Sequence, residues 1–193
     1  MINDVFTISP RRRDLHPTKE FWVAESYADR EKKIIDFING QKGATPHANM
    51  KYIREVSFGI KKTTTMDQLR DLATHIHEEC VIDCFQISIS RQNNVAHMLF
   101  DWYDYKNKQC FYLYEAYQMA MSAMIIRKLK LPFPKNLDSK WLRYLLSREY
   151  SENKHIYREF IEELKHKHLS KRFFTLGQQM STYIENVCKG IAK

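Results

Sequence analysis

The sequence predicts an α+β protein in which a small antiparallel sheet of three to four strands is flanked by helices and followed by an all-helical, basic C-terminal third. Apolar and polar residues alternate along consecutive segments between residues 85 and 114, which is the period of a β-strand. Apolar residues recur at helical spacing on both sides of these segments. Residues 1–126 hold 16 Lys+Arg and 16 Asp+Glu, whereas residues 127–193 hold 15 and 7, so the net charge of +8 lies in the last third.

Three strands and two turns form the predicted centre of the sheet. The strands cover residues 85–90, 95–104 and 109–114, and the polar stretches between them form turns. A fourth strand over residues 52–60 is expected at an edge. Pairing Arg91 with Asn94 and Asp104 with Gln109 separates an apolar core face from a mixed face. The core face holds Phe85, Ile87, Ile89, Ala96, Met98, Phe100, Trp102, Phe111 and Leu113. The mixed face holds Cys84, Gln86, Ser88, His97, Leu99, Asp101, Tyr103, Cys110 and Tyr112.

Helical spacing predicts the remaining elements. Pro17 suits the first turn of a helix over residues 17–39. Thr65 and Gln68 have the spacing of a capping box that starts a helix over residues 66–79. A nearly all-apolar, buried helix is expected over residues 115–130. Pro132-Phe133-Pro134 ends this helix. After it, three more helices are expected, over residues 137–149, 152–167 and 171–189.

Length and composition favour one domain. With 193 residues, 44% of them hydrophobic, the chain is large enough for a single core. We expect an N-terminal arm over residues 1–16, an α+β core over residues 17–131, and a basic helical region over residues 132–193 packed on that core. The four cysteines lack the spacing of a disulfide framework, so free thiols are expected. No apolar run approaches eighteen residues and no signal peptide is evident, so we expect a cytoplasmic protein that uses no membrane. No complete cofactor signature is found, so no cofactor is expected.

The charge distribution predicts a polyanionic partner. We therefore predict a non-enzymatic nucleic-acid-binding or nucleoprotein-associated accessory protein. On the mixed sheet face, Tyr103 and Tyr112 would stack bases, unless the helix over residues 17–39 covers that face. The alternative is a protein-interaction module, such as a scaffold, adaptor or inhibitor, whose basic face binds an acidic protein. The basic residues expected to contact phosphate are Arg127, Lys128, Lys130, Lys165, Lys167, Lys171 and Arg172.

The order helix, three antiparallel strands, helix over residues 66–130 resembles two known families in topology. The double-stranded-RNA-binding domain places lysines at the start of its second helix, where this chain has Tyr114 and Glu115. Restriction-type nucleases hold Mg²⁺ with an acid followed by acid-x-Lys. Asp104-Tyr105-Lys106, with Asp101 as the first acid, has these residue types but falls in a turn. A metal-dependent nuclease is the third interpretation.

His75, His77, Cys80 and Cys84 are four potential zinc ligands within ten residues. His75 and His77 are two apart on a predicted helix and point to different sides, so this is only a weak alternative. The sequence has no glycine-rich phosphate loop and no nucleophile elbow.

Overall fold

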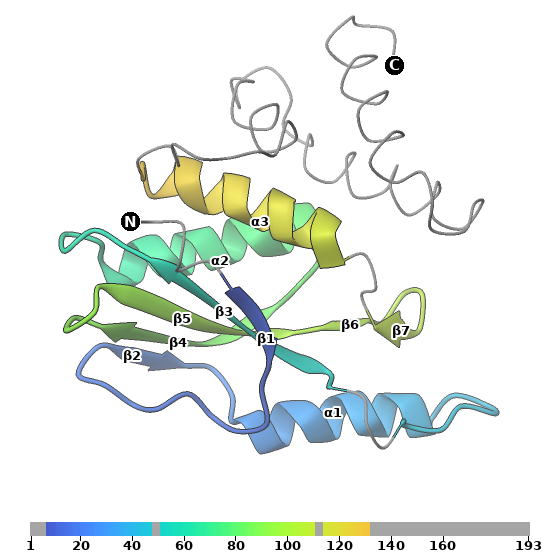
Figure 1. The fold of residues 1–193 in the computed structure, drawn as a ribbon. Helices are drawn as coiled ribbons and strands as arrows, with labels where there is room; N and C mark the ends of the chain where they lie inside the picture. The colour runs from blue at the N-terminus through green and yellow to red at the C-terminus, as the bar shows by residue number, and fades with distance from the viewer. Residues whose placement is uncertain (1–6, 48–50, 111–113, 132–193) are drawn as a thin grey trace, which may run out of the picture. The chain divides into compact units, whose positions relative to one another are not determined.

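A computed structural model of the chain describes residues 7–47, 51–110 and 114–131 (Figure 1). The chain divides into two compact units, Met1–Tyr112 and Leu113–Lys193. A five-stranded antiparallel sheet and helices α1 and α2 belong to the first unit, and helix α3 belongs to the second. The mixed α+β class is confirmed for these residues. The helices expected over residues 137–189, and with them the helical C-terminal third, lie outside the described residues.

The described residues form one five-stranded sheet in the order β1-β3-β5-β4-β2. Its strands are β1 (Thr7–Pro10), β2 (Phe21–Val23), β3 (Ile53–Gly59), β4 (Cys84–Ser90) and β5 (Val95–Asp101). Ser90 pairs with Val95, so Arg91 and Asn94 flank the turn as predicted. The strand expected at an edge, β3, lies between β1 and β5. Two short N-terminal strands occupy the two edges, which is why the sheet exceeds the predicted three to four strands.

The N-terminal predictions need correction. Residues 7–10 of the expected arm form β1, which pairs with β3 from Thr7↔Ser57 to Pro10↔Arg54. The predicted helix over residues 17–39 is divided, because Phe21–Val23 form β2 and helix α1 covers only Tyr27–Asn39. Ser26 caps α1 by accepting the backbone N–H of Asp29 at 3.1 Å. Phe21 and Trp22, which fall within the predicted helix, therefore belong to a strand.

A β-bulge between Cys84 and Gln86 changes the predicted faces. Ile87 lies opposite Met98 and Ile89 lies opposite Ala96, as expected for the core face. Phe85 instead joins the opposite face, in the buried cluster that also contains Leu99. The extra residue of a bulge puts two successive side chains on one face, so simple alternation fails at this point.

The second predicted hairpin is a separate two-stranded ribbon of β6 (Tyr103–Asp104) and β7 (Gln109–Cys110). Its predicted pairing, Asp104↔Gln109, is confirmed. The strand expected over residues 95–104 breaks at Trp102, whose backbone N–H donates to the carbonyl of Tyr52 at 2.7 Å. Residues 111–113 of the expected third strand lie outside the described part.

Helices α1 and α2 lie on opposite faces of the sheet (Figure 1). Helix α2 (Met66–Cys80) begins at the predicted capping box, with Thr65 and Gln68 each accepting the other's backbone N–H. It buries Leu69, Leu72 and Ile76. In the second unit, α3 (Tyr114–Lys128) matches the predicted helix within two residues, and its side chains are buried from Ala120 to Met121 and from Ala123 to Ile125. Within the described residues, Cys80, Cys84 and Cys110 are free thiols, and no helix is long and apolar enough to cross a membrane.

Candidate functional site

The mixed sheet face is covered. Leu15 donates its backbone N–H to Oε1 of Gln86 at 2.9 Å, and Nε2 of Gln86 donates to the carbonyl oxygen of Glu25 at 3.0 Å. Oγ of Ser88 donates to the carbonyl oxygen of His16 at 3.3 Å. Gln86 and Ser88 are buried as a result. The covering residues come from the segment between β1 and α1 and from α1 itself, so the face offers no open platform for a ligand.

Tyr103, expected to stack a base, is only 6% exposed. Its ring makes edge-to-face contacts with Tyr52, Phe37 and Tyr105, with centroids 6.0, 6.0 and 5.2 Å away. These neighbours occupy the surface that a base would need. Tyr112, the second expected stacking residue, lies outside the described residues.

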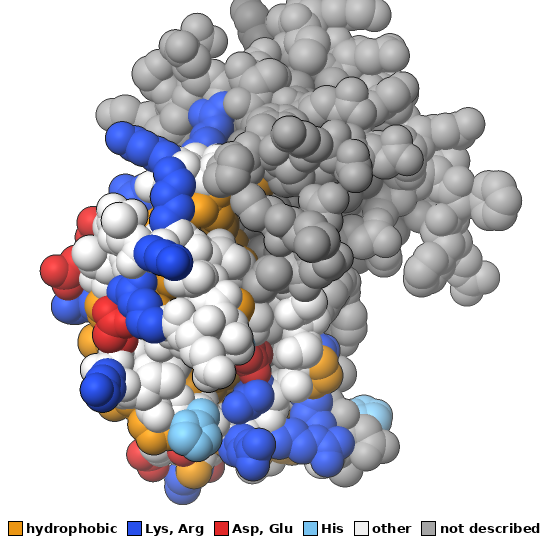
Figure 2. Space-filling model, turned by 60° about the vertical axis from the view of Figure 1, so that its left-hand side comes forward, with side chains coloured by type: hydrophobic (Ala, Val, Ile, Leu, Met, Phe, Trp, Pro, Cys, Tyr) orange, Lys and Arg blue, Asp and Glu red, His pale blue; other side chains and the backbone are white. Residues whose placement is uncertain are grey.

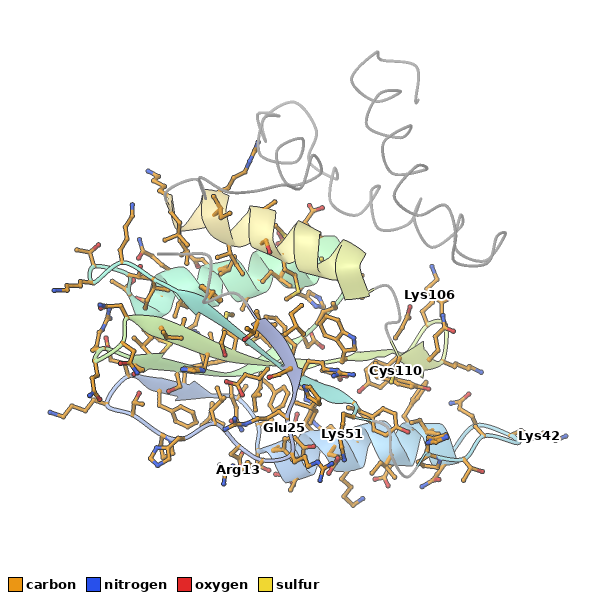
Figure 3. The ribbon with its side chains drawn as sticks, viewed as in Figure 1. Arg13, Glu25, Lys42, Lys51, Lys106 and Cys110 are labelled. Atoms are coloured by element: carbon orange, nitrogen blue, oxygen red, sulfur yellow. The ribbon has the colours of Figure 1, made fainter. Side chains whose placement is uncertain are left out.

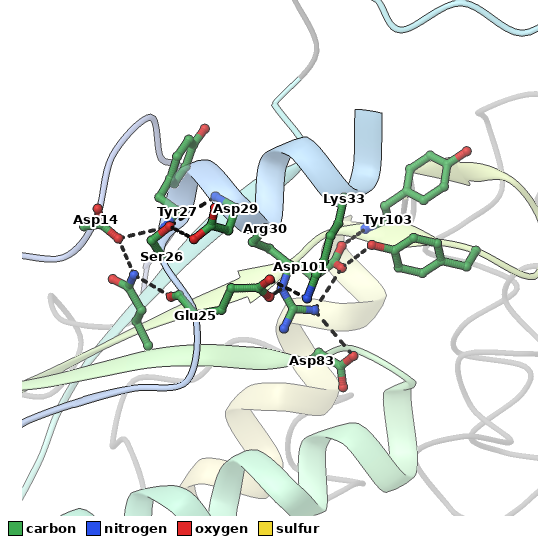
Figure 4. A network of polar contacts seen from close by, with 12 residues as sticks. Asp14, Glu25, Ser26, Tyr27, Asp29, Arg30, Lys33, Asp83, Asp101 and Tyr103 are labelled. Carbon is green, nitrogen blue, oxygen red and sulfur yellow. Dashed lines mark hydrogen bonds and ion pairs between the residues drawn. The ribbon is translucent and has the colours of Figure 1, made fainter. Parts of the chain in front are cut away.

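Asp101, the first suspected nuclease acid, belongs to a buried polar network (Figure 4). Its carboxylate accepts the Tyr105 hydroxyl at 2.6 Å and the Tyr103 backbone N–H at 3.1 Å. Arg30 of α1 lies 3.5 Å from this carboxylate and 2.7 Å from that of Glu25. Burial raises the pKa of Asp101 to about 6, although Tyr105 and Arg30 act in the opposite direction. This network fastens α1 and the β6 segment to the end of β5.

Asp104, another nuclease candidate, is the last residue of β6, and Lys106 lies in the turn between β6 and β7 (Figure 3). The Asp104 carboxylate accepts the backbone N–H groups of Lys106 and Asn107 at 3.1 and 3.0 Å, and the Asn107 side-chain amide at 2.7 Å. Such bonds close a turn. The carboxylates of Asp101 and Asp104 thus both accept hydrogen bonds from the protein itself. The acid-x-Lys spacing is explained by the turn that Asp104 closes.

Three of the four potential zinc ligands have other surroundings, and the fourth, His75, is half-buried in α2. Nδ1 of His77 lies 2.6 Å from the Asp83 carboxylate. Cys80 is buried, and burial raises the pKa of the Cys84 thiol, which donates to the carbonyl oxygen of Gln86 at 3.4 Å. Across residues 7–47, 51–110 and 114–131, no three His, Cys, Asp or Glu side chains are grouped to hold a metal ion.

The sequence reasoning missed a polar cluster of Ser57, His97 and Glu55. Ser57 and His97 face each other across β3 and β5. Nδ1 of His97 lies 3.0 Å from the Ser57 hydroxyl and 2.8 Å from the Glu55 carboxylate. In a catalytic triad, the serine and the carboxylate contact opposite ring nitrogens, whereas here both contact the same one. The hydrogen bond to His97 and the charge of Arg11, 2.7 Å from the Glu55 carboxylate, hold the pKa of Glu55 below its usual value. These contacts connect the residue after β1 with β3 and β5, which is a structural role.

A groove of about 460 Å³ lies between α2 and the edge strand β2. Trp22 of β2 forms one side, and the guanidinium of Arg70 lies 5.6 Å from the centre of its ring. No local pattern predicts this groove, because its two sides are more than forty residues apart in the chain. The lining residues are Trp22, Asp67, Arg70, Asp71, Ala73, Thr74, His77, Asp83 and Cys84.

Among the described residues, the outer side of β2 is an open strand edge. Glu20 accepts the backbone N–H of Ile89 at 3.0 Å, and Ala24 donates to the carbonyl oxygen of Phe85 at 2.9 Å. Because ladder bonds alternate along an antiparallel strand, the backbone groups of Phe21 and Val23 point away from β4. In the described part of the chain, no backbone group bonds them from the other side.

On the face drawn in Figure 2, Lys and Arg side chains of the described residues lie among acidic, apolar and other side chains. Arg13 and Lys42 lie near opposite ends of α1 (Figure 3). Of the predicted phosphate-binding residues, Lys128 and Lys130 are exposed at the end of α3, Arg127 is half-buried, and Lys165, Lys167, Lys171 and Arg172 lie outside the described residues.

No protein-family model, curated protein or solved structure matches the chain. The candidate site therefore rests on the geometry of the groove and of the strand edge beside it.

Proposed function

We propose that the first unit is a non-enzymatic protein-interaction module that binds a segment of a partner protein in the groove between β2 and α2. The observation that carries this proposal is the open edge of β2 directly beside that groove. Unpaired backbone groups on a sheet edge are a template for another chain, and a neighbouring groove supplies side-chain contacts.

The other interpretations receive less support from the described residues. The sheet face expected to take a nucleic acid base is covered, and Asp101 and Asp104 are bound to donors of their own chain. The groove, by contrast, is lined by exposed residues of α2 such as Arg70 and Thr74. It is both concave and accessible, as binding sites usually are.

Selection of random peptides displayed on phage against the full chain tests this proposal. Thr74→Trp adds bulk to the groove from an exposed position, and Gln92→Trp places the same side chain on the exposed β4–β5 turn as a control. We expect selected peptides to bind the parent and Gln92→Trp alike and to bind Thr74→Trp at least about tenfold more weakly, a loss typical of an interface residue. Equal affinity for all three proteins would exclude the groove.

A second function, nucleic acid binding by the basic C-terminal third, is proposed on the charge distribution alone. The whole net charge of +8 lies in residues 127–193, and a concentration of positive charge attracts a phosphate backbone. An acidic protein is the other partner that this region would suit. This proposal concerns the second unit and is compatible with protein docking at the first.

A further inference from the structure

We infer, resting on the proposed function, that the partner segment is an extended, basic peptide that adds to the sheet as a strand beside β2. Phe21 and Val23 each present an outward backbone N–H and C=O. Equivalent groups two residues apart on a strand are separated by about 6.8 Å, so a partner strand of four or five residues meets both. Backbone pairing of this kind supplies affinity that does not depend on the partner's side chains.

Successive side chains of such a strand would point to opposite faces of the sheet. Trp22 lies opposite Ile87, so its ring is on the α2 face of the sheet, whereas Phe21 and Val23 are on the other face. Partner residues on the α2 face would therefore enter the groove beside Trp22. Alternate residues would lie on the other face beside Val23, which is 50% exposed. The site thus favours a peptide in which one set of alternate residues is apolar.

The charge of the groove determines which alternate partner residues fit into it. Asp67, Asp71 and Asp83 contribute three carboxylates, against one guanidinium from Arg70. Arg70 already lies over Trp22 and 3.8 Å from the Asp67 carboxylate. The Asp83 carboxylate is half exposed and lies 2.6 Å from His77 and 3.9 Å from Arg30, which also pairs with Glu25 and Asp101. Carboxylates outnumber guanidinium groups in the lining, so Lys or Arg in the groove is favoured and Asp or Glu is disfavoured. This polarity is opposite to that of the basic C-terminal third.

Fluorescence anisotropy with three labelled eight-residue peptides tests the inference. One alternates Lys with Val, the second alternates Glu with Val, and the third is the Lys-Val peptide with every backbone amide N-methylated. We expect the full chain to bind the Lys-Val peptide at least tenfold more tightly than either of the others. Equal binding of the Lys and Glu peptides would overturn the charge assignment, and equal binding of the N-methylated peptide would overturn strand addition.

Two variants at one position locate the edge. Val23→Pro removes the outward N–H without removing a bond to β4, and Val23→Thr keeps that N–H as the matched control. We expect Val23→Pro to weaken Lys-Val binding about tenfold and Val23→Thr to leave it within twofold. Circular dichroism shows whether each variant folds; should Val23→Pro unfold, the N-methylated peptide still decides the question.

The outcomes separate this inference from the function on which it rests. Peptides that need an open Thr74 position but bind equally well when N-methylated would keep the groove as a docking site and reject strand addition. Failure of both the displayed library and the Lys-Val peptide would reject the proposed function itself. Sedimentation of the chain over a range of concentrations tests for self-association through the β2 edge. A dimer abolished by Val23→Pro would identify a second copy as the occupant and overturn the assignment to a foreign segment.

Discussion

The buried carboxyl group of Asp101 should make stability depend on pH. Its pKa is about 6 in the folded chain, against an ordinary value of 3.8, so the folded state keeps a proton that the unfolded chain has released. The contribution of the protonated carboxyl group to the free energy of unfolding is fully present below about pH 4 and is lost as pH rises through about 6. The total change is about 3 kcal/mol. Asp101→Asn cannot ionise, so its free energy of unfolding should lack this decline. Urea denaturation of both proteins from about pH 4 to pH 7 measures the two slopes, and parallel curves would contradict the assignment.

Val81 carries backbone strain that a substitution should release. It ends α2 with a φ of 58°, a left-handed conformation that a β-branched side chain adopts at a cost, and its side chain is 66% exposed. Val81→Gly should raise the free energy of unfolding by about 1 kcal/mol, the cost of the left-handed conformation less the extra freedom of glycine in the unfolded chain. Val23→Gly, at another exposed valine but in a strand, should lower it. Thermal melting compares the three proteins, and a loss of stability in Val81→Gly would show that the valine makes compensating contacts.

At the scale of whole elements, α2 depends on its cap. Thr65 accepts the Gln68 N–H at 3.3 Å, which satisfies one of the backbone donors that a helix leaves unpaired at its start. Thr65→Ala should therefore lower the free energy of unfolding by about 1 kcal/mol, and Thr65→Ser, which keeps a hydroxyl, should change it by only a few tenths. Chemical denaturation measures both. Equal losses in the two variants would mean that the methyl group, not the hydroxyl, matters.

The sequence predicted elements whose signal is local. Alternation identified β4 and β5, the Asn-rich turn placed Arg91 and Asn94, and the spacing of Thr65 and Gln68 marked the start of α2. Strand β2 was missed because three residues are too few to show a period, although Ser26 followed by Asp29 could have marked the true start of α1.

The features that escaped prediction depend on tertiary contacts. The bulge that moves Phe85 to the other face has no mark in the alternation, since Phe85 is as apolar as its neighbours. The groove needs β2 and α2 to come together from distant parts of the chain, and the cluster of Ser57 and His97 needs the pairing of β3 with β5. Periodicity describes one element at a time and cannot supply these combinations.

For the molecule as a whole, the proposal that the basic third binds nucleic acid makes a quantitative prediction. Replacing Lys165, Lys167, Lys171 and Arg172 by Ala should weaken binding to all sequences about equally. For duplex DNA, each lost phosphate contact should reduce the slope of log affinity against log salt by about 0.9. Titrations at several salt concentrations measure this slope.

The matched control for this prediction is a second fourfold alanine variant. It replaces four exposed lysines of the first unit, Lys42, Lys61, Lys62 and Lys106. We expect this control to keep the parental slope. A folded C-terminal variant that also keeps the parental slope would show that its four residues do not form the site.

The order of strands in the sheet also determines how long each new strand waits for its partner during synthesis. The two N-terminal strands occupy the edges, while β3 and the hairpin of β4 and β5 form the interior. Strand β2 ends at Val23 and its partner begins at Cys84, about sixty residues later, which a ribosome adds in about 3–12 s. During that interval the nascent chain carries Phe21 and Trp22 with no sheet to join. The sheet is therefore completed only after the β4–β5 hairpin has been made, and β2, the strand of the open edge, waits longest for its partner.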